Sequence, residues 1–117
     1  MAGTFNASVT GVAGSGNASL PSEFRLEQNY PNPFNPSTGI TFQVPSGRAK
    51  TSGATGVQVS LKVYDLAGKE VATLADGMFL PGTYMVRFDG ADLSSGVYFY
   101  RLRSEGVTIA RRMVLLK

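Results

Sequence analysis

The sequence contains no cysteine, histidine or tryptophan among its 117 residues. Without cysteine the chain has no disulfide and no thiolate nucleophile, and without histidine it lacks the commonest metal ligand and general base. Asp65, Asp89 and Asp92 lie in turn sequences, where carboxylates cap backbone amides. We therefore predict a protein that is not an enzyme, with no catalytic residue, cofactor or metal site. Weak ion binding by Asp89 and Asp92 around Gly90 is the alternative that the acidic residues leave open.

Long hydrophobic runs are also absent. No apolar stretch approaches the length that crosses a bilayer, so no membrane anchor is visible, and the first residues do not have the pattern of a signal peptide. The charged fraction is 16% and the formal net charge is +3. Most of the late basic residues alternate with apolar ones, which predicts a solvated sheet face and no nucleic-acid binding. These residues are Arg101, Arg103, Arg111, Arg112 and Lys117.

What the sequence does contain is typical of turn-rich β structure. It has 14 glycines and 6 prolines, and 43% of its residues are hydrophobic. From residue 21 onward, apolar and polar residues alternate with a period of two, and no helical period is visible. The alternation predicts strands at 24–26, 40–44, 57–64, 69–75, 84–88, 97–102 and 107–116. We predict one all-β domain over 21–117, an antiparallel β-sandwich of about seven strands.

The turns between these strands have their own signals. Asp65 can cap a turn through its carboxylate, and Gly68 can adopt the positive φ that a short hairpin requires. Gly77 and the pair Pro81-Gly82 are expected in the next loop, and the polar stretch 46–56 is expected to be a long exposed loop.

Three prolines alternate with asparagines in the run 29–38, NYPNPFNPST, which we call the proline corner. Each proline fixes its own φ and pushes the preceding residue toward extended geometry, so the run is neither helix nor central strand. We expect a stiff turn that holds the rings of Tyr30 and Phe34 against the core. An ordinary proline-rich linker is the alternative.

The two ends of the sequence differ in character. Residues 1–20 are mainly small and polar, which predicts an arm with a short strand near 4–12 followed by a flexible spacer. The last seven residues, RRMVLLK, are mostly apolar. A strand with this composition is either buried in the sheet or offered to a receptor.

Several stretches resemble the C-terminal sorting domain of proteins exported by the type IX secretion system of Bacteroidetes and related bacteria. They are LEQNYPNPFNPSTGITFQVP, VSLKVYDLAGKEVATL, PGTYMVRFDG, LSSGVYFYRL and RRMVLLK. The resemblance runs from Phe24 to Lys117 and implies an immunoglobulin-like sandwich, similar also to the sandwich domain of flagellar hook-capping proteins. The loop at 46–56 is longer than the resemblance leads us to expect.

The resemblance implies a secretion signal for an N-terminal passenger protein. The domain would be recognised by the outer-membrane machinery, and a sortase-type peptidase would then remove it, with cleavage between Gly14 and Ser22. The passenger would reach the outer membrane, the cell surface or the medium through the periplasm. The recognition and fold residues that it implies are Asn32, Pro33, Phe34, Asn35, Pro36, Asp65, Gly68, Gly82, Tyr84, Gly96, Tyr98, Arg112, Met113, Val114, Leu115, Leu116 and Lys117.

We expect recognition by β-augmentation, in which residues 107–117 pair with a strand of the receptor. Two alternatives remain open. One is a structural subunit that assembles into homo-oligomers or filaments by strand addition through residues 1–20. The other is a carbohydrate-binding module that uses Tyr64, Tyr98 and Tyr100, although strand tyrosines more often pack across a sheet.

Overall fold

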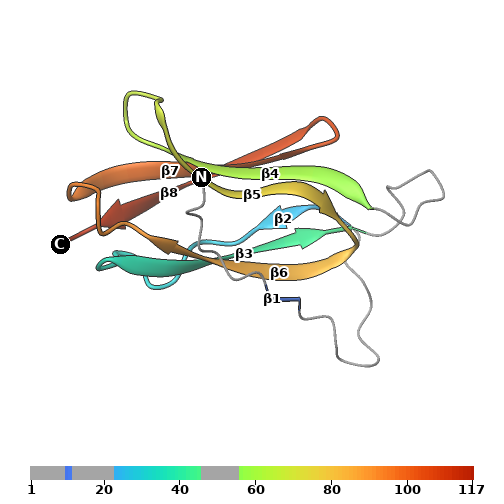
Figure 1. Ribbon diagram of the computed structural model, residues 1–117, viewed down its shortest axis with the longest axis horizontal. Coiled ribbons are helices and arrows are strands. Elements are labelled where there is room, and N and C mark those ends of the chain that lie inside the picture. The colour runs from blue at the N-terminus through green and yellow to red at the C-terminus, as the bar shows by residue number, and fades with distance from the viewer. Residues whose placement is uncertain (1–9, 12–22, 46–55) are drawn as a thin grey trace.

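The computed structural model describes residues 10–11, 23–45 and 56–117. These residues form strands and turns only (Figure 1). The strands are β1 (Thr10–Gly11), β2 (Arg25–Leu26), β3 (Ser37–Val44), β4 (Val57–Tyr64), β5 (Glu70–Phe79), β6 (Gly82–Asp89), β7 (Gly96–Ser104) and β8 (Val107–Leu115). Apart from the two-residue β1, these are the seven antiparallel strands that the sequence predicts. The described residues include no helix long and apolar enough to cross a membrane.

The strands form two sheets that pack face to face (Figure 1). Sheet A has the order β1-β6-β3-β2, and sheet B has the order β5-β4-β7-β8. All pairs of these strands are antiparallel. The predicted all-β sandwich is therefore confirmed, and β8 is an edge strand of sheet B.

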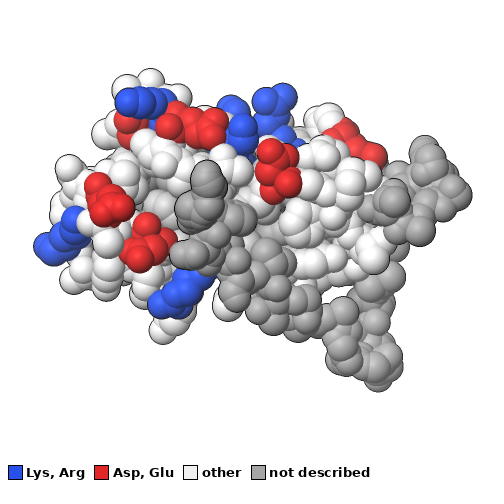
Figure 2. All heavy atoms as spheres, in the orientation of Figure 1, with Lys and Arg blue, Asp and Glu red and all other residues white. Residues whose placement is uncertain are grey.

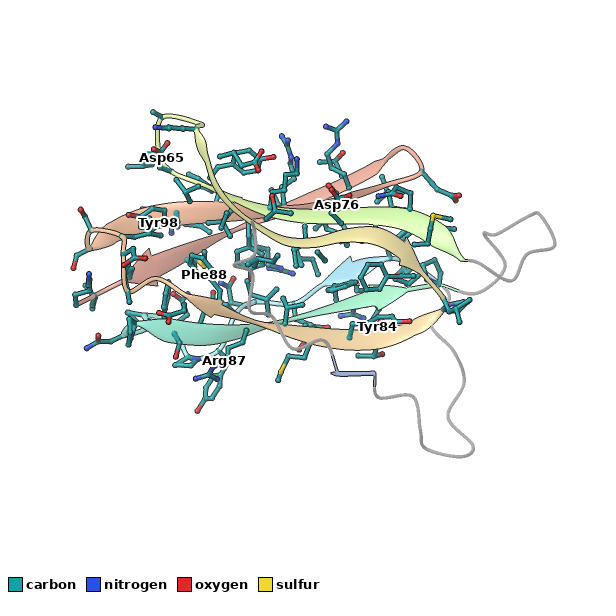
Figure 3. All side chains as sticks on the ribbon, viewed as in Figure 1. Asp65, Asp76, Tyr84, Arg87, Phe88 and Tyr98 are labelled. Carbon is teal, nitrogen blue, oxygen red and sulfur yellow. The ribbon has the colours of Figure 1, made fainter. Side chains whose placement is uncertain are left out.

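The core lies between the sheets, because each central strand turns alternate side chains inward. In β4, Val57, Val59, Leu61 and Val63 are buried and the residues between them face outward, as predicted. Aromatic rings fill both ends of the sandwich. Phe42, Phe79 and Tyr84 contact one another at centroid distances of 5.0–5.5 Å, and Phe34 meets Phe88 edge to face at 5.9 Å. Tyr84 and Phe88 mark these two ends in Figure 3.

The predicted turn at Asp65 is confirmed. The Asp65 carboxylate accepts hydrogen bonds from the amides of Ala67 and Lys69, each at 2.9 Å, and Gly68 has a φ of 88°. The strand after this turn is longer than predicted, because β5 continues to Phe79. The expectation that Gly77 begins a loop was wrong. Gly77 is paired with Val59 inside the sheet, since pairing with β4 extends as far as Phe79.

Two predicted segments lie largely outside the described residues. The loop at 46–56 is described only at Gly56, and the arm at 1–20 only at Thr10–Gly11. These two residues form β1, which pairs with Tyr84 and Met85 of β6. They fall within the strand predicted near 4–12. The domain boundary at residue 20 stays a prediction.

Candidate functional site

The proline corner holds one of its two aromatic rings in the core and leaves the other in solvent. Phe34 is 1% exposed, as predicted, whereas Tyr30 is 83% exposed, so the expectation that its ring contacts the core was wrong. The backbone of Tyr30 exchanges two hydrogen bonds with Gly39 of β3, at 2.9 and 3.0 Å. Asn29 is buried at the preceding position. Because successive side chains of an extended chain point to opposite faces, the Tyr30 ring points outward.

The corner also pairs with the end of β8. The Phe34 amide donates to the carbonyl of Val114, and the Leu116 amide donates to the carbonyl of Phe34, each at 2.9 Å. The side-chain oxygen of Asn32 accepts a hydrogen bond from the Val114 amide at 3.0 Å. Both outward backbone groups of Val114 are therefore occupied by the corner.

The contact extends further back along β8. The Gln28 side-chain amide donates to the carbonyl of Arg112 at 2.8 Å, and the Arg111 guanidinium donates to the carbonyl of Leu26 at 2.6 Å. Residues 26–34 thus lie along the outer edge of the carboxyl-terminal half of β8. We call this arrangement the terminal clamp. It joins segments that are 80 to 85 residues apart in the sequence.

A tyrosine hydroxyl anchors the start of the corner from the opposite sheet. The Tyr100 hydroxyl donates to the carbonyl of Glu27 and accepts from the amide of Asn29, each at 2.7 Å. The Asn29 side chain donates to the Thr38 hydroxyl and to the Pro31 carbonyl, at 3.0 and 3.1 Å. Tyr100, Asn29 and Thr38 are all buried. This network was not predicted, and its one sequence signal is a polar tyrosine at an inward position of a strand.

We predict that replacing Tyr100 with phenylalanine lowers the free energy of unfolding by about 2–4 kcal/mol, because it leaves two backbone groups without their partner. The matched control is Tyr84→Phe. The Tyr84 hydroxyl donates to the Leu80 carbonyl at an exposed site, so its loss should cost about 1 kcal/mol or less. Urea denaturation of the two variants measures the difference. Equal losses would show that the Tyr100 hydroxyl does not anchor the corner.

The same hydroxyl predicts a pH dependence. Burial raises the pKa of Tyr100 to about 12, against an ordinary value of 10.0. Between these values the unfolded chain loses the phenolic proton while the folded chain keeps it, so stability falls as pH rises, by at most about 1.4 kcal/mol per pH unit. Below this pH window the hydroxyl is protonated in both the folded and the unfolded state, so it does not make stability depend on pH. Urea denaturation at about pH 9 and about pH 11 measures this effect. The free energy of unfolding should fall less between these two pH values for Tyr100→Phe than for the parent chain.

The remaining predicted residues of the terminal strand divide between core and surface. Met113 and Leu115 are buried, which confirms that the strand is held in the sheet. Leu116 is 53% exposed, and Arg112 faces solvent. The Lys117 ammonium donates to the carbonyls of Ala91 and Leu93 at 2.7 and 2.8 Å, which ties the residues after β8 to the β6–β7 loop.

The corner is packed tightly at Gly90, beside the predicted residues Asn35 and Pro36. The Gly90 amide donates to the Pro36 carbonyl at 2.7 Å. A Cβ atom at Gly90 would lie 3.1 Å from Leu115 and 3.4 Å from the ring of Phe34. A side chain at this position would therefore push on both halves of the terminal clamp.

Two pairs of predicted residues, Gly82 with Tyr84 and Gly96 with Tyr98, have the same local structure. Tyr84 and Tyr98 each follow a glycine by two residues, Gly82 and Gly96, and these glycines begin β6 and β7. Each hydroxyl donates at 2.7 Å to the carbonyl four residues upstream, on Leu80 and Ser94 respectively. The sequence pattern Gly-x-Tyr therefore marks two strand starts at which the preceding loop is tied down.

The predicted residues do not form one site. Asn32, Phe34, Val114 and Leu116 meet in the terminal clamp, whereas Asp65 lies at the β4–β5 turn and Tyr84 at the far end of the sandwich (Figure 3). Tyr98 and Tyr100 are buried, so they cannot act as stacking platforms for sugars. Tyr64 is covered by Arg101, whose guanidinium carbon lies 4.6 Å from the ring centroid.

On the face shown in Figure 2, acidic and basic side chains are interspersed. Asp65 and Asp89 accept hydrogen bonds from turn amides, as the sequence predicts. No group of three or more acidic side chains is placed to hold a metal ion in the described parts of the chain. On the outer face of sheet B, Arg103 and Arg112 are exposed and Arg101 is partly buried. This agrees with the expectation of a solvated basic sheet face.

The arrangement is that of a β-sandwich whose terminal strand is locked to an upstream corner. Comparison with known families agrees with this class. The family model described as the secretion system C-terminal sorting domain matches residues 28–116, and the chain belongs to that family. A search of curated proteins found no match.

Membership of the family defines the role of the chain. It is a C-terminal sorting domain of the type IX secretion system, which targets a protein for secretion. A domain of this kind is a non-catalytic signal. It interacts with the type IX machinery and is exported to the cell surface or outside the cell.

Proposed function

We propose that this domain carries a passenger, linked upstream of residue 28, across the outer membrane and that the folded terminal clamp is the part that the machinery recognises. The observation that carries the proposal is the pairing of Asn32 and Phe34 with Val114 and Leu116. These residues are adjacent only when the chain is folded. A signal built from them reports that the domain is complete, which no linear peptide signal can do.

The clamp refines the expected β-augmentation by residues 107–117. Val114 has its outward amide and carbonyl occupied by the corner. A receptor strand could pair with this part of β8 only by displacing the corner. The machinery therefore recognises the carboxyl-terminal half of β8 as part of a folded surface.

The proposal includes the fate of the domain. The passenger passes through the periplasm to the outer membrane, and a sortase-type peptidase cleaves between Gly14 and Ser22. The family match supports this placement, because it begins at residue 28 and leaves the expected cleavage segment outside the matched residues. The cleavage segment lies outside the described residues.

A fusion experiment tests this function. A periplasm-directed reporter joined upstream of residues 1–117 is expected at the surface or in the medium of a host with type IX machinery. The same reporter joined to residues 1–27 is expected to stay in the periplasm, because it carries the spacer without the matched domain. Mass spectrometry of the exported reporter should place its new end between residues 14 and 22. Retention of the full fusion in the periplasm would refute the proposal.

A second candidate is assembly through residues 1–20, and the pairing of β1 with β6 favours it. Thr10 and Gly11 add to the edge of β6 beside Met85 and Tyr84 within one chain. The arm of a second copy could occupy the same edge by exchange. The mass in solution, with and without residues 1–20, tests this function. A monomer in both cases excludes it.

A further inference from the structure

We propose that the amino-terminal half of β8, from Thr108 to Ala110, is a docking edge for an extended acidic segment of a partner protein. The inference deepens the proposed function, on which it rests, by separating β8 into two parts. The carboxyl-terminal half is locked in the terminal clamp, and the amino-terminal half is open to a partner.

The four edges of the sandwich are not equally open. Strands β1, β2, β5 and β8 lie at the sheet edges. Strands β1 and β2 have two residues each. The pairing of β5 with β4 has two register shifts, and such bulges twist an edge and discourage further pairing. In contrast, β8 pairs with β7 over nine consecutive residues without a shift. It is therefore the long, regular edge of the described residues.

The hydrogen bonds of β8 show which of its backbone amides and carbonyls are available to pair with a partner strand. Even-numbered residues of β8 present their backbone to the outer edge. This follows from the contacts that residues 28–34 make with the backbone of Arg112, Val114 and Leu116. By the same alternation, Thr108 and Ala110 point their amides and carbonyls outward. No described residue outside β8 is hydrogen-bonded to the backbone of either on that side. Both side chains are exposed and small, so a partner strand can approach closely.

The charges beside this edge determine the chemistry of the partner. Arg103 lies directly across from Thr108, and Arg112 follows Ala110 on the same face of β8. Both are exposed, and no described carboxylate lies within ion-pair distance of either. Since Thr108 and Ala110 are short, the long side chain of Arg103 can reach over them. Acidic side chains at alternate positions of an added strand would meet these arginines.

The same charges argue against a second copy of this chain as the occupant. Two copies of β8 side by side would place arginines next to one another, and like charges across a strand pair are destabilising. Arginines on an edge strand therefore discourage self-pairing while they favour an acidic partner. The turn of the β7–β8 hairpin rises away from sheet A in Figure 1.

The test uses the reporter fused to the full chain, in a host with the type IX machinery. Ala110→Pro removes one outward amide, and a proline at such a position is tolerated on an edge strand. Ala110→Thr is the matched control, because it adds bulk and keeps the amide. Arg103→Glu with Arg112→Glu reverses the charge beside the edge, and Arg87→Glu makes the corresponding change at an exposed position of sheet A. Thermal unfolding of each purified chain shows whether it folds, and Thr108→Pro replaces Ala110→Pro if the latter does not.

We expect Ala110→Pro and the double arginine variant each to lower surface display by about tenfold, Ala110→Thr to retain more display than Ala110→Pro, and Arg87→Glu to match the parent. Parental display by Ala110→Pro would overturn the docking edge. Parental display by the double arginine variant would overturn the acidic partner. An equal loss for Arg87→Glu would show an effect of charge in general and would overturn the site as well. The proposed function fails separately, if the parent fusion itself is not exported.

Discussion

Replacing Phe34 with alanine is expected to lower the free energy of unfolding by about 3–5 kcal/mol. The ring is 1% exposed and contacts Phe88 edge to face, so its removal leaves a cavity at one end of the core. The lost edge-to-face contact adds to the cost of the cavity. The Phe34 backbone also carries two hydrogen bonds of the terminal clamp, and the cavity would allow these to shift.

Tyr30→Ala is the matched control, four residues earlier in the same corner. Its ring is 83% exposed, so the substitution should change stability by no more than about 0.5 kcal/mol. Urea denaturation compares the two variants, and export of a fused reporter gives the functional result. Similar stability losses would mean that the corner does not anchor the core through Phe34. A stable Phe34→Ala domain that is not exported would instead assign the ring itself to recognition.

The contrast between these two rings shows the limit of prediction from the sequence. The prolines correctly exclude a helix and a central strand at 29–36, because their effect on φ is local. Which ring faces inward depends on the pairing of Tyr30 with Gly39, and that pairing joins parts of the chain that the local pattern does not relate. Both rings fit the same sequence pattern, so only the tertiary structure distinguishes them.

Strand faces were predictable where the alternation is strict. In β4 the inward residues were all correct, because a period of two fixes the face of every residue once one is known. The end of β5 was not predictable from Gly77, since glycine usually weakens a strand. Pairing with β4 supports the strand past this position, and the space above Gly77 is open.

The two parts of the terminal clamp were each visible in the sequence. The apolar terminal residues indicated a strand either buried in the sheet or offered to a receptor, and the structure holds it in the sheet. That the two contact each other follows from hydrogen bonds between Asn32, Phe34 and Val114, which no local pattern reveals. The anchoring of the corner by Tyr100 was missed for the same reason.

Removing Val114 to Lys117 is expected to have the largest effect of all, a loss of both the cooperative fold and export. The deletion takes away Leu115, which is fully buried, and a lost leucine side chain alone costs about 2–5 kcal/mol. It also leaves Asn32 and Phe34 without their hydrogen-bond partners. The sum is comparable to the whole stability of a small domain, about 5–15 kcal/mol.

Circular dichroism during heating measures the fold of the truncated chain, and the reporter fusion measures export. Leu116→Ala is the control, because its side chain is 53% exposed while its amide still bonds to Phe34. This variant should fold like the parent, so a loss of export by it would be a loss of recognition and not of folding. Leu115→Ala separates the two roles of the segment, since it keeps the backbone of the clamp and removes only core packing. If export is lost in proportion to stability in both Leu115→Ala and the truncation, the segment acts by completing the fold. Export of the truncated chain at the parental level would show that the terminal clamp is not required.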